Sequence, residues 1–402
     1  MDSVVTTKKS FADVTYDEAL RRAESLIPLL KLHADESEKL THMAPAVLKA
    51  LHETGLLRYM QPKRWGGMEL DFVSVFDLPE MLGRGDASAA WTFTNLAAHH
   101  RLLALWDPKA QEEIWGDNPD MLIASGIAFA QGKARKVDGG YVINGRWGFS
   151  SGVDVSTWNM LACQVIDSDK VVDYRMCLVP LPEFEVIDDW QTLGMRGTGS
   201  RTVQCKDIFV PAHRAVSMYT QAPGFEYPGW KVNTAAQYRI PLSGFGGTGI
   251  GGSMSGNARA MLDAAIDMVK ARSTAYTGAK MRDFQTVQLR IGMAGAKIDA
   301  ARHLMRNDCI EAQNALEAGR GIDIPTRLRY KRNSAAGTKL VTEAVESLFE
   351  MAGANGIYDS APMQRMYRDA KAGGAHINFN VDVNLSPWAL VSLGGEFKSP
   401  TL

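Results

Sequence analysis

The sequence predicts an α+β fold in which one β-rich segment separates two helical ones. In the first third of the chain, apolar residues such as Leu20, Ala23 and Ile27 recur at helical spacing. From about Leu122 the chain changes to short β-rich runs, and after Pro228 the helical period returns and continues to the end. This order of elements favours segregated helical and β layers over an alternating βαβ sheet.

We expect the first domain, residues 1–121, to be helical. Thr15-Tyr-Asp-Glu18 has the pattern of a capping box at a helix start. A later helix is expected from about Ala44 to Glu53, with Gly55 as its left-handed C-cap. Asp86 is expected to cap a further helix, which carries candidate site residues described below.

The second domain, residues 122–230, is expected to be an antiparallel sheet or barrel. Its apolar runs are short, and turn signals separate them: Asp138-Gly139-Gly140, Asn144-Gly145 and Asp167-Ser168-Asp169. Tight turns of this kind join strands that are antiparallel neighbours, which is why an antiparallel domain is expected here.

The third domain, residues 231–402, is expected to be a four-helix bundle. The stretches Thr286–Ala318 and Arg327–Met351 hold few helix breakers. Helices of such length are rarely stable unless they pack against one another, so a bundle is the natural arrangement.

The run Gly247-Thr-Gly-Ile-Gly-Gly252 matches the glycine pattern of dinucleotide-binding turns. A true site of that kind follows a hydrophobic strand, whereas the residues before this run contain Pro241 and little β pattern. We therefore interpret the run as a flexible connection into the next helix, and we expect no nicotinamide site in this chain.

Composition and charge exclude several classes of protein. Lys and Arg (44) nearly balance Asp and Glu (45), so neither nucleic acid nor an anionic membrane is an expected partner. The four cysteines lie far apart, and neither they nor the histidines have the spacing of a metal site. The N-terminus lacks the apolar core of a signal peptide, and no apolar run approaches the ~20 residues of a membrane span. We therefore expect a cytoplasmic protein without a metal.

Two polar loops are candidates for ligand binding. Trp147-Gly-Phe149-Ser-Ser151-Gly152 ends a predicted strand, and Arg196, Thr198 and Ser200 alternate with glycines in the stretch 193–200. Backbone N–H groups and hydroxyls exposed in such loops can hold a polar ligand. From composition alone, an ordinary strand end and a surface hairpin loop remain the alternatives.

Three histidines are candidates for acid–base chemistry, since imidazole titrates near neutral pH. His376 is expected at the far end of a helix that begins near Pro362, among small residues that leave room for a ligand. A structural role remains the alternative for it. His99 and His100 are adjacent on a predicted helix, so they point in different directions, and at most one of them should face a given pocket.

Four stretches, taken in order, resemble the oxygenase components of two-component flavin monooxygenases built on the acyl-CoA dehydrogenase fold. The resemblance covers nearly the whole chain, and its stretches are Arg84–Trp91 followed by His99, Gly139–Gly152, Gly194–Ser200, and Arg368-Asp369 with His376 and Asp382. It implies an N-terminal helical domain, a middle antiparallel β domain and a C-terminal four-helix bundle, in a homotetramer.

This resemblance implies a definite chemistry. The flavin would arrive reduced, as FADH2 or FMNH2, from a separate NAD(P)H-dependent reductase, and would react with O2 to form a C4a-hydroperoxide. That species would hydroxylate a small aromatic or heteroaromatic substrate of the phenol or indole type. A dry cavity and a held flavin N5–H would slow its decay to peroxide.

The resemblance also implies roles for individual residues. Ser151 would contact flavin N5, and His376 would lie near flavin and substrate, where it could deprotonate a phenol. His99 would touch the substrate, with His100 as the reserve. The positions that would line the flavin are Trp147, Phe149, Arg196, Thr198, Ser200, Phe284 and Gln285.

Three alternatives stay open at the level of sequence. In many acyl-CoA dehydrogenases a catalytic Glu follows the Arg-Asp-Ala stretch, and the register places Ile377 there, so a dehydrogenase or oxidase would need its base elsewhere. A monooxygenase of the same fold could instead oxidise nitrogen or sulfur. A non-catalytic flavin-binding or scaffold protein is the third alternative.

Overall fold

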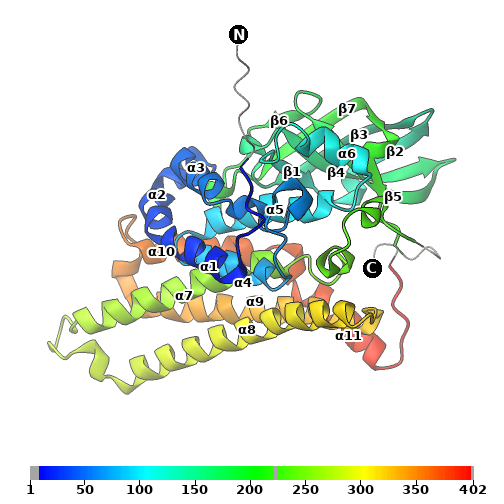
Figure 1. The fold of residues 1–402 in the computed structure, drawn as a ribbon. Helices are drawn as coiled ribbons and strands as arrows, with labels where there is room; N and C mark the ends of the chain where they lie inside the picture. The colour runs from blue at the N-terminus through cyan, green and yellow to red at the C-terminus, as the bar shows by residue number, and fades with distance from the viewer. Residues whose placement is uncertain (1–8, 221–224, 400–402) are drawn as a thin grey trace, which may run out of the picture.

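The computed structural model describes residues 9–220 and 225–399, with a β domain beside a long helical layer. Figure 1 shows the strands at the upper right and the long helices α8 (Gln285–Glu317) and α9 (Ile324–Ala352) along the bottom. Helix α5 (Ala87–Leu103) lies between them. It contacts both strand β1 (Ile123–Gly126) and helix α7 (Thr248–Ala271).

The caps predicted for the N-terminal helices are present in the structure. Thr15 accepts a hydrogen bond from the Glu18 backbone at 3.3 Å, and Gly55 is left-handed, with φ 73°. Asp86 accepts hydrogen bonds from the first backbone N–H groups of α5 and so caps that helix. The other helices of this part are α1 (Tyr16–Ser25), α2 (Ile27–Leu40), α3 (Pro45–Glu53), α4 (Ser74–Gly83) and α6 (Pro108–Trp115).

The β domain is one mixed sheet rather than a purely antiparallel one. The strand order is β6-β7-β3-β2-β4-β5-β8, and β1 pairs with β4. Most pairs are antiparallel as predicted, but β1 and β2 both run parallel to β4. Strand β2 has a different neighbour on each side. On one side it pairs with β3 as an antiparallel hairpin, and on the other it pairs with β4, which a longer connection makes parallel to β2. The bounds are β2 (Gly132–Val137), β3 (Gly140–Ser150), β4 (Trp158–Asp167), β5 (Lys170–Pro180), β6 (Glu185–Ile187), β7 (Arg201–Pro211) and β8 (Ala215–Ser217).

The C-terminal part is a helical bundle, as predicted. Its three long helices, α7, α8 and α9, pack against one another. Two shorter helices, α10 (Pro362–Gly374) and α11 (Val381–Ser392), both pack against α9, so the bundle has one helix more than the predicted four in the described part of the chain.

The glycine run at the start of α7 is helical and buried, so the prediction of a flexible connection is wrong. A Cβ on Gly252 would lie 2.5 Å from the carbonyl oxygen of Phe76, and one on Gly256 would lie 2.1 Å from that of Glu80. Both carbonyls belong to α4. Glycine is therefore required at these positions for the backbones of α7 and α4 to approach so closely.

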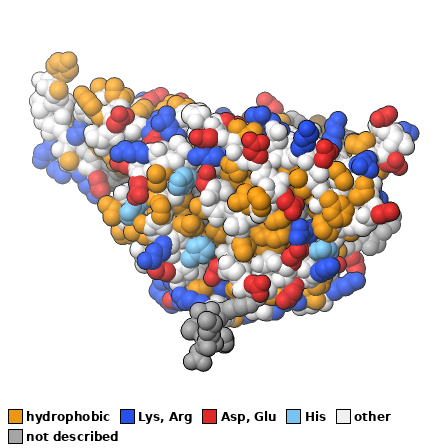
Figure 2. Space-filling view, turned by 90° about the horizontal axis from the view of Figure 1, so that it is seen from above, with side chains coloured by type: hydrophobic (Ala, Val, Ile, Leu, Met, Phe, Trp, Pro, Cys, Tyr) orange, Lys and Arg blue, Asp and Glu red, His pale blue; other side chains and the backbone are white. Residues whose placement is uncertain are grey.

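Charged side chains of both signs are mixed on the face of the molecule that Figure 2 shows, with hydrophobic side chains gathered between them. Over residues 9–220 and 225–399, no helix combines the length and the apolar character that crossing a bilayer requires.

Candidate active site

Ser151 and Ser200 meet where two neighbouring strands end. Strands β3 and β7 are antiparallel, and Ser150 is paired with Arg201, so the residues just beyond this pair lie side by side. The Oγ atoms of Ser151 and Ser200 are 2.7 Å apart, and both side chains are buried. The two polar loops predicted from the sequence thus form one cluster.

The hydroxyls of Ser151, Ser200 and Thr198 form a chain with a fixed direction. Thr198 Oγ1 donates its hydrogen to the carbonyl oxygen of Met195 at 2.8 Å, because a carbonyl can only accept. Ser200 Oγ lies 2.6 Å from Thr198 Oγ1 and must therefore donate to it. Ser151 in turn donates to Ser200, which leaves the lone pairs of Ser151 Oγ to accept a hydrogen bond from a ligand.

Helix α10 holds Met195 in place. The Met195 N–H donates to Asp369 Oδ1 at 2.6 Å, and its carbonyl also accepts the Trp190 indole N–H at 3.2 Å. A Cβ on Gly194 would lie 2.2 Å from the Arg368 carbonyl oxygen, so the loop is pressed against α10. Sequence reasoning missed this role of Asp369, although the Arg368-Asp369 pair was part of the resemblance and could have pointed to it.

His99 is buried, and one hydrogen bond fixes its tautomer. Its Nδ1 lies 2.5 Å from the carbonyl oxygen of Ile123, so Nδ1 carries a hydrogen. Burial lowers the pKa of His99 to about 4, so the ring is neutral near pH 7. Its Nε2 then carries a lone pair that can accept a proton.

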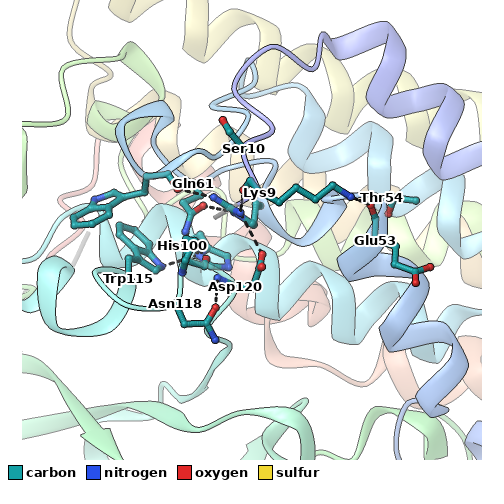
Figure 3. Close-up of polar contacts among 12 residues, drawn as sticks. Lys9, Ser10, Glu53, Thr54, Gln61, His100, Trp115, Asn118 and Asp120 are labelled. Atoms are coloured by element: carbon teal, nitrogen blue, oxygen red, sulfur yellow. Dashed lines mark hydrogen bonds and ion pairs between the residues drawn. The ribbon is translucent and has the colours of Figure 1, made fainter. Parts of the chain in front are cut away.

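His100 belongs to a different network, which Figure 3 shows. The Trp115 indole N–H donates to His100 Nδ1 at 3.1 Å, and Gln61 Nε2 lies 3.4 Å from the same nitrogen. The Trp115 and His100 rings are stacked, with centroids 5.7 Å apart. Arg58 extends the network by donating Nε to Gln61 at 2.6 Å. Burial lowers the pKa of His100 to about 3. These contacts favour a structural role for His100.

His376 lies just beyond α10 rather than within a helix, and it caps the short helix η11 (Ile377–Phe379). Its Nδ1 accepts a hydrogen bond from the Asn378 backbone at 3.2 Å. Burial lowers the pKa of His376 to about 4, so the ring is neutral near pH 7. The remaining hydrogen must then lie on Nε2, which makes His376 Nε2 a donor, the opposite of His99 Nε2.

Helix α5 carries His99 and contacts both the serine turn and His376. A Cβ on Gly152 would lie 3.0 Å from the Leu96 side chain, and His99 follows on the same face of α5, three residues later. Trp91, near the start of α5, meets His376 edge-on, with ring centroids 5.6 Å apart.

Comparisons with known proteins place the chain in a family. The model described as acyl-CoA dehydrogenase, N-terminal domain, matches residues 23–115, and the one described as acyl-CoA dehydrogenase, C-terminal domain, matches residues 248–381. The flavin-dependent monooxygenase oxygenase subunit HsaA of Rhodococcus jostii (strain RHA1) is 34% identical over 358 residues, which cover 89% of this chain and 93% of the relative. The chain belongs to the flavin-dependent monooxygenases built on the acyl-CoA dehydrogenase fold.

Two further relatives of this monooxygenase agree. The oxygenase component of the FADH(2)-dependent resorcinol hydroxylase of Rhizobium sp. (strain MTP-10005) is 30% identical, and the match covers 90% of each chain. The crystal structure of the HsaA monooxygenase from M. tuberculosis is 30% identical with a TM-score of 0.91, and the match covers 96% of this chain and 100% of that chain. The predicted fold and the predicted flavin-dependent monooxygenase are thus confirmed in preference to a dehydrogenase.

Phe149 of this monooxygenase fits one wall of a flavin site. Its backbone is left-handed, with φ 63°, a conformation that a bulky side chain rarely adopts. Its ring is 74% exposed, and Trp190 meets it edge-on with centroids 6.0 Å apart. The exposed ring offers an apolar face against which a planar ring system could lie. With the acceptor at Ser151 two residues away, the residues present fit a flavin.

Trp147 does not line the site, contrary to the sequence prediction. It is fully buried in the β domain, where its indole N–H donates to the Ala162 carbonyl at 2.8 Å. The register of β3 against β7 shifts between Trp147 and Ser150. Such a bulge breaks the strand alternation, so Phe149 faces solvent while Trp147 stays inside.

The other predicted flavin-lining residues lie at the edge of the cluster or apart from it. Arg196, which begins the short helix η5 (Arg196–Thr198), pairs with Glu38 of α2 at 3.7 Å. Phe284 and Gln285 are exposed at the connection between α7 and α8, which Figure 1 shows at the opposite end of the molecule from the β domain. One chain alone therefore does not bring Phe284 and Gln285 to Ser151.

Proposed function

We propose that this monooxygenase is the oxygenase component of a two-component system that hydroxylates a small phenol with O2 and reduced flavin. One observation carries the proposal: His99 is buried, His376 is half-buried and both rings are neutral near pH 7, yet Nε2 accepts in His99 and donates in His376. Such a pair can remove one proton and hold another oxygen atom at the same time. The resorcinol hydroxylase among the relatives supports a phenol as the substrate class.

Ser151 holds the flavin through its acceptor oxygen. Reduced flavin, when bound, supplies the activated oxygen for the hydroxylation. With its hydrogen directed to Ser200, Ser151 Oγ would accept the N5–H of reduced flavin without placing a charge beside it. Ser151, Ser200 and Thr198 are buried, so water would have little access to this hydrogen from their side, and the loss of activated oxygen as peroxide would be limited.

His99 takes the proton of the phenol hydroxyl at Nε2. The Nδ1–H bond to the Ile123 carbonyl orients the ring and stabilises the positive charge that develops on it. Sequence reasoning gave this role to His376, whose Nε2 already carries the hydrogen. His376 therefore donates a hydrogen bond to an oxygen atom at the reacting centre.

A separate NAD(P)H-dependent reductase supplies the reduced flavin, as FADH2 or FMNH2. The glycine run that resembles a dinucleotide turn is filled by the backbone of α4, so it has no room for a pyrophosphate. The four cysteines are free and buried, which suits a reducing cytoplasm.

The working assembly is a homotetramer, and the start of α8 supports contact with another copy. Phe284, Leu289 and Met293 there are 39%, 67% and 55% exposed. Apolar side chains gathered on an exposed helix are typical of a surface that packs against a partner. Phe284 and Gln285 then reach the flavin of a neighbouring copy rather than that of their own chain.

The test is rapid mixing of the anaerobic protein with reduced FMN or reduced FAD, followed by O2, with and without resorcinol. We expect a transient flavin spectrum before reoxidation, and a hydroxylated product when the phenol is present. The flavin that supports this transient identifies the cofactor. Direct reoxidation with release of peroxide for both flavins, and no product from phenols, would overturn the proposal.

A further inference from the structure

We infer that Thr198 and Ser200 make the flavin site selective for reduced over oxidised flavin, because they fix Ser151 as a hydrogen-bond acceptor. This inference deepens the proposed function and rests on it. The sequence predicts that Thr198 and Ser200 line the flavin, whereas the structure places their hydroxyls behind that of Ser151. They are positioning residues, since they act through Ser151.

The direction of the hydroxyl chain follows from its end at a carbonyl. Each hydroxyl has one hydrogen, and that of Thr198 goes to the Met195 carbonyl oxygen at 2.8 Å. Ser200 and Ser151 then donate in the same direction, at 2.6 Å and 2.7 Å. The reverse order would free the hydrogen of Ser151 for a ligand, but only by breaking the Thr198–Met195 bond.

The surroundings of the chain oppose such a reversal. Thr198, Ser200 and Ser151 are 1%, 5% and 8% exposed, so water is largely kept from replacing a lost hydrogen bond. Met195, the final acceptor, is held through its N–H by Asp369 at 2.6 Å. The order of hydrogens is therefore a property of the fold before any ligand binds.

An acceptor at Ser151 distinguishes the two redox states of a flavin. Reduced flavin carries a hydrogen on N5, which Ser151 Oγ accepts. Oxidised flavin has a lone pair on N5, which would face the lone pairs of Ser151 and leave both acceptors unpaired. An unpaired buried acceptor is unfavourable enough that we expect oxidised flavin to bind about tenfold more weakly through this contact alone.

The experiment is anaerobic titration of reduced and oxidised FMN and FAD into the full-length protein. The readout is the dissociation constant of oxidised flavin divided by that of reduced flavin. In Ser200→Ala the hydroxyl of Ser151 loses its acceptor and can turn to donate to oxidised N5. We expect the ratio to fall about tenfold, with most of the change in the oxidised state. Thr198→Val, which keeps the shape and removes the hydroxyl, should lower the ratio in the same direction.

Thr198→Ser is the matched control, because it keeps the hydroxyl and should keep the ratio. Ser151→Ala should remove the selectivity whatever stands at residue 200, so Ser151→Ala and the double variant should agree. The midpoint potential of the bound flavin gives a second readout: it should fall in Ser200→Ala, since the reduced state loses its advantage. If Ser200→Ala and Thr198→Val still bind reduced flavin and their ratio of dissociation constants equals that of the original protein, the inference is overturned and the proposed function stands. If the original protein binds neither flavin, both are overturned.

Discussion

His99 and His100 are neighbours in the chain, yet they face different regions of the molecule. His99 lies on the same face of α5 as Leu96, which packs against the Ser151 turn at Gly152. Its Nδ1 donates to the carbonyl oxygen of Ile123, the first residue of β1. His100 lies among the N-terminal loops, and its Nδ1 accepts from Trp115. Burial lowers the pKa of both, to about 4 and about 3.

This contrast shows that burial and a shifted pKa do not by themselves mark a catalytic histidine. The two rings differ in which nitrogen carries the hydrogen, and that is decided by one carbonyl and one indole N–H. His99 is left with a basic Nε2, and His100 with an Nε2 that already holds its hydrogen. Substitutions of His99 and His100 therefore separate loss of a catalytic base from loss of a structural contact.

The largest effect is expected for His99→Ala. Loss of the basic Nε2 should lower kcat/KM for a phenol by about 100-fold to 10,000-fold, the usual range for a general base. His99→Asn is the matched control for folding, because its amide can still donate to the Ile123 carbonyl but offers no base at the Nε2 position. Steady-state hydroxylation with saturating reduced flavin measures the effect. Wild-type rates in His99→Asn would show that the base is elsewhere.

His100→Ala should change stability rather than turnover. It removes the acceptor of the Trp115 indole N–H and leaves a cavity beside that ring, so the free energy of unfolding should fall by about 2–4 kcal/mol. Urea unfolding gives the stability, and the activity per folded molecule gives the comparison with His99→Ala. An activity loss as large as that of His99→Ala, in protein that is fully folded, would remove the distinction between the two histidines.

His376→Ala extends the comparison to the donor on the other side of the site. Loss of the Nε2–H should lower the yield of hydroxylated product per flavin oxidised by about tenfold, the value of one buried hydrogen bond. His376→Gln can place an amide N–H near the same position, so it should recover much of the yield. If glutamine and alanine give equal yields, donation by His376 is not the cause.

The pH dependence of the rate should show the smallest effect. The folded-state pKa of His99 lies at about 4, well below the ordinary value of about 6.5, because burial disfavours the charged ring. The base form is therefore present above about pH 4 and is lost only as the pH falls through that value. We expect kcat/KM to stay level between pH 8 and pH 5. An acid limb near pH 6.5 would mean that the essential base is exposed, unlike His99.

The sequence was most informative where the structure depends on local contacts. Asp86 could be assigned as a cap because an N-cap side chain bonds the backbone of the residues that follow it. The α8 and α9 helices could be predicted because they lack breakers over many turns. Strand β2 was missed because half of its residues are Lys or Arg and because no local pattern reveals its pairing with β3 and β4.

Parts of the site depend on contacts between distant segments, and these could not be predicted. Trp147 and Phe149 alternate in sequence as if they shared a face, and only the bulge against β7 separates them. The tautomer of His99 is set by the carbonyl of Ile123, which lies in strand β1 and is not visible in a side-chain pattern. The tautomer of His376 is set locally, by the backbone N–H of Asn378. Ser151 and Ser200 could be named as site residues, but the direction of their hydrogen bonds comes from the Met195 carbonyl.

Helix α10 has a place in both halves of the site. Asp369 in this helix holds Met195, the final acceptor of the three hydroxyls. At the C-terminal end of the same helix, the backbone continues through Ala375 to His376. A movement of α10 on flavin binding would therefore also move His376 and change the affinity of the protein for its substrate. Thermodynamic linkage requires such an effect to be mutual, so substrate would change the affinity for flavin by the same factor. Titration of flavin with and without substrate, and of substrate with and without flavin, would measure this coupling free energy directly.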